Sequence, residues 1–183
     1  MRRFFTLLIA SMMAFGLSAQ DKTLRVDYIF SGTDKSVEIS LDEMSCFDGW
    51  AGRRVNTDAV PVRGNGQISL TDAQTGKVLY RQSFSTLFQE WQTTEEATKV
   101  RKAFENVFLL PMPESKAVVR VELYDFWGSI YASLNHEVDP ADILIRKINP
   151  VPAQHRYLHQ GGTSEKCIDV AIVAEGYAEE ELD

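Results

Sequence analysis

Two histidines toward the C-terminal end have the spacing of zinc ligands on a helix. His155 and His159 are four residues apart, which would place both imidazoles on one helical face. A hydrolytic zinc site of this kind needs a glutamate directly after the first histidine to activate the metal-bound water, but this chain has Arg156 there. Prolines before the pair and glycines after it also disfavour a helix. We therefore predict no catalytic and no metal-binding residue in this chain.

Tryptophans and arginines in loop-like stretches are the candidates for binding. Trp50, Trp127, Arg53 and Arg54 are predicted as partner-binding residues, because exposed Trp and Arg side chains often anchor protein interfaces. Trp127 lies in a turn between two alternating segments, so it is the indole that we expect to be exposed. The alternative is that Trp50 and Trp91 close the ends of a sandwich and that the two arginines form a solvated edge.

Other polar residues are predicted to be structural. Asp42, Glu43 and Asp48 are close in sequence but lack the regular oxygen spacing of a calcium loop, so we interpret them as a solvated acidic loop. His136 lies in the inward register of an alternating strand, which predicts a hydrogen-bonded histidine in the core or at its edge.

The N-terminal residues 1–19 are predicted to be a secretory signal peptide. Arg2 and Arg3 precede an apolar stretch that ends at Leu17, and we place cleavage after Ala19. The stretch is shorter than the roughly 20 residues of a membrane-spanning helix. We expect an exported protein, periplasmic or extracellular, with no membrane span after cleavage; a retained anchor is the alternative.

The charge and the cysteines limit the partners and the cross-links. The formal net charge is -7, and an acidic protein has no long-range attraction for nucleic acid, so we predict no nucleic-acid partner. In an oxidising compartment Cys46 and Cys167 either form a disulfide or remain two separate buried thiols.

Alternating apolar residues predict a mainly β fold. About seven strands, separated by turn signals every ten to fifteen residues, indicate an antiparallel β-sandwich, Ig-like in appearance, over residues 20–140. Residues 42–61 are predicted to be a long connection with a helical turn near 41–46, and residues 85–91 to form one or two helical turns. Residues 97–110 suit a helix or a strand, and we predict a short helix or irregular lead-in followed by a strand.

The end of the chain is predicted to begin a second domain. Residues 141–165 are interpreted as a linker with an extended piece at 143–145. From Ile168 to Ala174 the chain is apolar except for Asp169, which predicts a strand buried on both faces. Three glutamates follow Ala178, where a helix N-terminus would favour negative charge. We expect residues 166–183 to be the start of a truncated α/β domain.

Several of these stretches together resemble a known family. They look like the N-terminal region of the IgA-peptidase type of zinc metallopeptidase found in Bacteroides-like bacteria, cut before its catalytic motif. The stretches that carry the resemblance are residues 21–28, Trp50-Ala51-Gly52-Arg53-Arg54, Gly64-Asn65-Gly66, residues 85–91, residues 138–145 and residues 167–177.

The resemblance implies a non-catalytic role for this chain. In that family a β-sandwich precedes a zinc-dependent catalytic domain, and the H-E-x-x-H helix that binds zinc lies further on. We therefore expect an accessory domain that supports or positions a catalytic peptidase domain, with zinc bound in that missing domain and no cofactor in this chain. The alternative is a stand-alone secreted β-sandwich that binds a protein or glycan ligand.

Overall fold

The computed structural model describes residues 22–60, 62–151, 156–163, 166–168 and 170–173. The chain divides into two compact units, Met1–Pro150 and Val151–Asp183. The predicted signal peptide, His155 and Asp169 lie outside the described residues, as does the segment from Ala174 onward.

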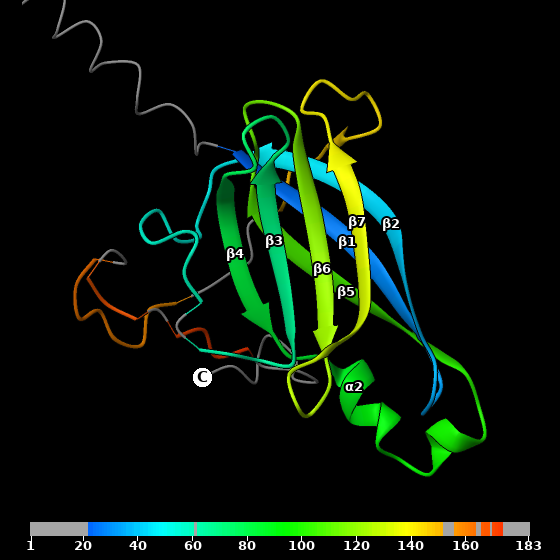
Figure 1. Ribbon diagram of the computed structural model, residues 1–183. Coiled ribbons are helices and arrows are strands. Elements are labelled where there is room, and N and C mark those ends of the chain that lie inside the picture. The colour runs from blue at the N-terminus through cyan, green and yellow to red at the C-terminus, as the bar shows by residue number, and fades with distance from the viewer. Residues whose placement is uncertain (1–21, 61, 152–155, 164–165, 169, 174–183) are drawn as a thin grey trace, which may run out of the picture. The chain divides into compact units, whose positions relative to one another are not determined.

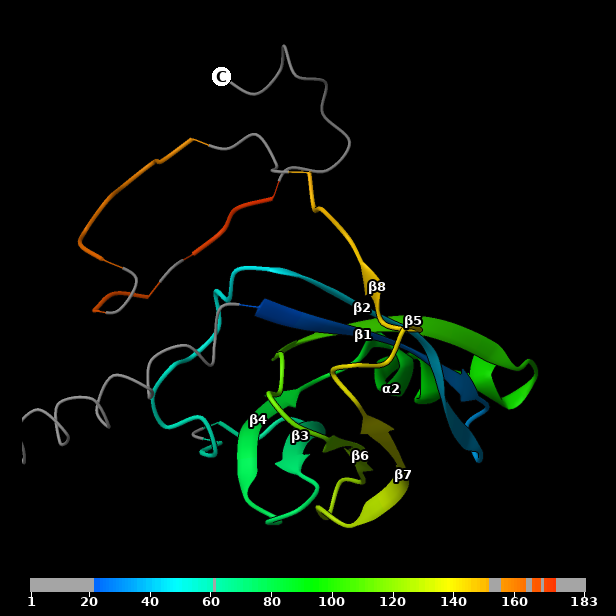
Figure 2. The same cartoon turned by 90° about the horizontal axis from the view of Figure 1, so that it is seen from above.

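The first unit is a β-sandwich, which confirms the predicted fold class. Its two four-stranded sheets have the orders β5-β1-β2-β8 and β4-β3-β6-β7 (Figure 1). Viewed from above, they lie as two facing layers (Figure 2). All neighbouring strands are antiparallel except β2 and β8. The strands are β1 (Lys22–Gly32), β2 (Val37–Asp48), β3 (Gly66–Asp72), β4 (Val78–Phe84), β5 (Lys102–Pro111), β6 (Ala117–Tyr124), β7 (Ile130–Val138) and β8 (Arg146–Lys147).

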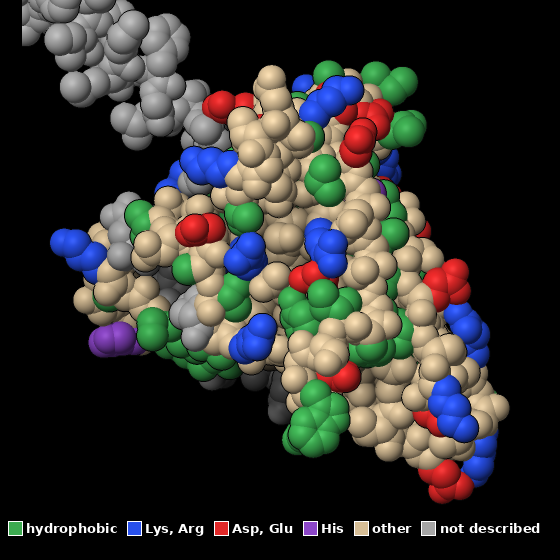
Figure 3. All heavy atoms as spheres, viewed as in Figure 1, with side chains coloured by type: hydrophobic (Ala, Val, Ile, Leu, Met, Phe, Trp, Pro, Cys, Tyr) green, Lys and Arg blue, Asp and Glu red, His purple; other side chains and the backbone are tan. Residues whose placement is uncertain are grey.

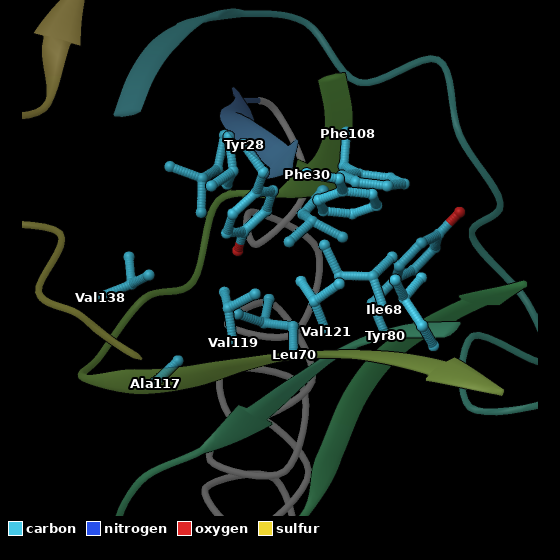
Figure 4. Packing of buried hydrophobic residues seen from close by; sticks show 14 of the residues in the cluster. Tyr28, Phe30, Ile68, Leu70, Tyr80, Phe108, Ala117, Val119, Val121 and Val138 are labelled. Atoms are coloured by element: carbon cyan, nitrogen blue, oxygen red, sulfur yellow. The ribbon is translucent and has the colours of Figure 1, made fainter. Parts of the chain in front are cut away.

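Alternating side chains build the core between the two sheets. Every second residue of β1 is fully buried, and β6 repeats the pattern from the opposite sheet. Figure 4 shows Tyr28, Phe30 and Phe108 directed at Val119 and Val121 across the interior. Because the side chains of a strand point alternately to its two faces, this periodicity sets which face of each sheet is buried.

One helix closes the end of the sandwich. Helix α2 (Leu87–Gln92) begins after Thr86, whose side-chain oxygen accepts a hydrogen bond from the Gln89 N–H at 3.1 Å. The helical turns predicted for residues 85–91 are confirmed. Phe88 and Trp91 are buried, so the predicted role of Trp91 as an end plug also holds, but Leu87 is exposed.

The connection predicted for residues 42–61 is wrong up to Asp48, where β2 ends, and is confirmed for residues 49–60, which form no helix or strand. There is no helical turn at 41–46. Asp27 pairs with Glu43 and Tyr28 with Leu41, which leaves Asp42 as an extra residue in β2. Such a bulge reverses the inward and outward positions on either side of it. The alternation of apolar and polar residues is therefore interrupted at Asp42, although the strand continues to Asp48.

Residues 97–110, which suit a helix or a strand in the sequence, form mainly a strand. A single 3-10 turn, η1 (Glu96–Thr98), precedes the strand. The prediction of a short lead-in followed by a strand is confirmed, and the helical alternative for residues 102–110 is wrong. Phe104 and Phe108 point into the sandwich as alternate residues of β5, where they contact aromatic rings of the core.

The first unit extends beyond its predicted end at Pro140. Ile145 is 7% exposed and belongs to the core, and β8 adds a parallel strand to β2. Part of the predicted linker is thus integral to the sandwich, and the compact unit reaches Pro150.

The predicted C-terminal strand is not formed among the described residues of the second unit. Ile168, Val170, Ile172 and Val173 have no strand assignment and are 79–92% exposed. A strand buried on both faces needs partners on both sides, and the described residues supply none here.

Candidate functional site

The structure brings two of the predicted binding residues, Trp50 and Arg53, together. Trp50 meets Tyr80 edge to face, with ring centroids 5.3 Å apart. The Arg53 guanidinium lies 5.5 Å from the centroid of the same Tyr80 ring. The indole N–H of Trp50 donates to the Arg53 carbonyl at 3.2 Å. The loop after β2 and strand β4 therefore share an aromatic and cationic cluster.

This cluster lines a hollow of about 550 Å³. Its other walls come from β4 and β5, namely Gln82 and Leu109, and from the loop residues Ala51 and Gly52. A side chain at Gly52 would collide with the Trp50 ring, since a Cβ there would lie 2.1 Å from it. The loop can fold tightly over the indole because that position is glycine.

The arginines of this loop already donate to backbone carbonyls of the loop and of β4. Arg53 donates to the carbonyls of Asn56 and Arg81, and Arg54 donates to the Trp50 carbonyl at 2.9 Å. Trp50 is only 7% exposed, which confirms the alternative of a packed indole at this position. These residues shape the hollow, and binding of a partner by them stays a prediction.

Trp127 lies elsewhere, in the turn between β6 and β7, and is 86% exposed as expected. Its neighbour Phe126 is 92% exposed and packs against it edge to face, with ring centroids 5.3 Å apart. The carboxylate of Asp125 accepts hydrogen bonds from the backbone N–H groups of Trp127 and Ser129. Figure 3, which has the same view as Figure 1, shows hydrophobic side chains at the lower end of the sandwich, where Figure 1 places the turn between β6 and β7.

A tyrosine and a histidine link the two sheets inside the sandwich. The Tyr28 hydroxyl of β1 lies 2.6 Å from Nε2 of His136 on β7. Nδ1 of the imidazole lies 3.2 Å from the Glu137 carbonyl, which can only accept, so Nδ1 carries the proton and the Tyr28 hydroxyl donates to Nε2. Burial lowers the pKa of His136 and raises the pKa of Tyr28. The predicted hydrogen-bonded histidine is confirmed.

A polar network on the outer face of the second sheet was not predicted. Glu122 is only 8% exposed and accepts from Arg120, from the Tyr124 hydroxyl at 2.8 Å and from the Gln67 amide at 3.3 Å. Burial, followed by the hydrogen bond to Glu122, raises the pKa of Tyr124 to about 12. Its three β6 members share one face of the strand, but no local spacing indicates that Gln67 of β3 joins them.

No zinc or calcium site fits the described residues. Among them, no group of three or more His, Cys, Asp or Glu side chains is placed to hold a metal ion. Asp42 and Asp48 are exposed strand residues of β2, and the part of the predicted histidine pair that is described, His159, is exposed. Cys46 is a buried free thiol and Cys167 an exposed one, so the expectation of two buried thiols is wrong for Cys167, and the disulfide alternative stays a prediction.

Comparison with known protein families gives one match. Residues 14–134 match the family model described as Peptidase M64 N-terminus, a span that contains β1 to β6 and part of β7. No curated protein matches the chain. No helix in the described part of the chain is both long and apolar enough to cross a membrane.

Proposed function

Because this chain belongs to the family of peptidase M64 N-terminal domains, the IgA-peptidase type, we propose that its sandwich is the non-catalytic accessory domain of a secreted zinc metallopeptidase. In this role it supports and positions the catalytic domain that follows it. Zinc binds in that catalytic domain and not in the sandwich. The observation that carries the positioning role is the way in which the chain leaves the sandwich at β8.

The exit of the chain is held by packing, backbone pairing and charge. Ile145 enters the core, and the Ile148 N–H donates to the Cys46 carbonyl at 2.9 Å. Between them Arg146 pairs with Glu43 of β2. A segment fixed at three successive points leaves the sandwich in a defined place and direction. These contacts fix the path of the chain up to Ile148.

The turn before β8 offers a surface beside this exit. The Asp139 carboxylate accepts from the Ala141 N–H, and the Asp142 carboxylate accepts from the Leu144 N–H, each at 2.9 Å. These bonds hold a turn in which Ile143 is 93% and Leu144 74% exposed. Two neighbouring exposed aliphatic side chains next to the exit suit an interdomain contact, so we assign them to the interface with the catalytic domain.

An insertion experiment tests the positioning role. In a polypeptide that carries the sandwich and its peptidase domain, about ten glycine and serine residues are inserted after Pro150 to release the second domain from the exit. The melting temperature of the sandwich should stay unchanged, while kcat/KM for a protein substrate falls. A kcat/KM equal to that of the uninterrupted polypeptide would remove the positioning role.

Export is the second part of the proposal. Its support is the charged, apolar and small-residue order of residues 1–19. N-terminal sequencing of the protein expressed in a Gram-negative host should find a periplasmic or extracellular chain that begins at Gln20. Recovery of an uncleaved chain in the cytoplasm would contradict export.

A protein- or glycan-binding module is the alternative function, and the turn between β6 and β7 favours it. Trp127 and Phe126 project from a turn whose backbone is fixed by Asp125, so little conformational freedom is lost on binding. Binding to glycan and protein arrays should decrease for Trp127→Ala and persist for Val62→Ala, which alters a side chain of similar exposure. Equal array signals for both variants would dismiss this function.

A further inference from the structure

Among the described residues, one edge of the first sheet has no further strand paired with it. β5 pairs with β1 on one side and is the outermost strand on the other. The Met112 N–H donates to the Lys22 carbonyl, and such bonded pairs recur at every second residue of an antiparallel ladder. Since β1 and β5 pair without a register shift, the backbone groups that point away from β1 are those of Ala103, Glu105, Val107 and Leu109.

The corresponding edge of the second sheet is covered. On β4 the Arg81 N–H donates to the Thr57 carbonyl at 2.8 Å, and the Arg53 side chain donates to the Arg81 carbonyl. Within the described residues, no backbone hydrogen bond from another segment reaches the outward groups of Val107 and Leu109. The loop thus protects one of two neighbouring edges and leaves the other available.

The open edge has apolar side chains and a hollow beside it. Val107 is 49% and Leu109 45% exposed, and Leu109 also lines the hollow of about 550 Å³ whose walls include Trp50 and Tyr80. Charged residues, which commonly discourage pairing at sheet edges, occur at Lys102 and Glu105 but not from Val107 to Leu110. Pro111, which has no N–H, ends the strand.

We propose that the outer edge of β5 binds an extended stretch of unfolded polypeptide as an added strand. Unpaired N–H and C=O groups at strand spacing are matched by another extended backbone, which identifies the class of ligand. The main chain of the ligand pairs with Val107 and Leu109, and one of its apolar side chains enters the hollow beside Trp50. This site goes beyond the proposed accessory role and does not depend on it.

The probe is reduced and carboxamidomethylated α-lactalbumin, a permanently unfolded chain, with native α-lactalbumin as its folded control. Both are acidic like this chain, so net charge attraction does not produce binding. The unfolded form should bind to the exported chain in a titration and the native form should not. Equal binding of the two forms, or binding of neither, would overturn the proposal.

Two variants at one position test the edge itself. Val107→Pro removes an outward N–H and should weaken binding of the unfolded probe at least tenfold, whereas Val107→Thr keeps the N–H and should bind as the parent does. Undiminished binding by the proline variant would refute pairing at this edge.

Hydrogen exchange tests the same edge without a substitution. In the parent protein, the amides of Ala103, Glu105, Val107 and Leu109 should exchange quickly, and the bound probe should slow the exchange of Val107 and Leu109. If the probe leaves those amides unchanged, it binds elsewhere and the proposal fails, even where Val107→Pro does not fold.

Discussion

The hydrogen bond between Tyr28 and His136 connects the packing of the two sheets with the dependence of stability on pH. It joins β1 of one sheet to β7 of the other, and Nε2 of the neutral imidazole accepts a hydrogen bond from the tyrosine hydroxyl. Protonation of Nε2 would reverse donor and acceptor, because the hydroxyl oxygen can also accept, and it would place a positive charge in a partly buried site. The partly buried imidazole therefore stabilises the sandwich most when His136 is neutral.

Stability should depend on pH through His136. Burial lowers its pKa in the folded protein below the ordinary value of 6.5, so the unfolded chain takes up the proton first. The contribution is complete above pH 6.5 and is lost as the pH falls through the folded-state pKa. Urea unfolding between about pH 7 and pH 5 should show a falling free energy of unfolding.

The control for this pH dependence is His136→Gln, whose amide does not titrate. Its free energy of unfolding should change less than that of the parent over the same pH range. The carboxyl groups of Asp72, Glu96 and Asp139 have lowered pKa values, so their contributions are lost only at more acidic pH. Parallel curves for parent and variant would show that His136 is not the titrating group.

Single residues differed in how far the sequence could predict them. The position of His136 followed from its strand register, because a period of two places it inward. The surroundings of Trp50 and Glu122 could not be predicted, because their partners Tyr80 and Gln67 lie on other strands. Exposure of Trp127 was predictable since a turn between two adjacent strands projects from the sheet.

Among the elements, β8 is the shortest strand but is firmly attached to the sandwich. It is only two residues long, but it is anchored by the buried side chain of Ile145. Ile145→Ala should lower the free energy of unfolding by about 2–4 kcal/mol, because it leaves a cavity in the core.

The matched control is two residues away in the same turn. Ile143→Ala removes the same atoms from a side chain that is 93% exposed, so its free energy of unfolding should stay within about 0.5 kcal/mol of the parent. Denaturant unfolding of both variants measures the difference. Similar losses for the two would mean that Ile145 does not anchor the segment.

β2 and β8 could not be predicted fully because their sequences lack a continuous alternation of apolar and polar residues. β2 carries a bulge at Asp42, which interrupts the alternation that had marked its first half. β8 is too short for any period to be visible, and its partner β2 is distant in the sequence. By contrast, β6 and β7 are long and joined by a short turn, their register shift lies beside that turn, and the two alternating segments around the turn were predicted.

At the scale of the whole molecule, the sandwich should fold without the second unit. Truncation after Pro150 keeps the core and β8, so the melting temperature should stay within about 2 °C of that of the full chain. Truncation after Pro140 removes Ile145 and β8, and should lower the melting temperature by about 5–15 °C. Calorimetry measures the melting temperatures of both truncated proteins. A large decrease for the protein that ends at Pro150 would show that the second unit is integral to the fold.

The family could be identified from separated sequence stretches, and the match over residues 14–134 agrees with that resemblance. The site could not be identified in the same way. The described residues hold no cluster of metal ligands, and the hollow at Trp50 and the open edge of β5 depend on tertiary packing.

We propose that the sandwich holds a peptidase domain at its β8 exit, and NMR spectra of the backbone amides can test this. Spectra of residues 20–150 are compared with those of the same residues joined to the peptidase domain. The signals of Ile143, Leu144 and Arg146 should shift, while those of β3 and β6 remain in place. Coincident signals for all three residues in the two spectra would show that no domain is held there.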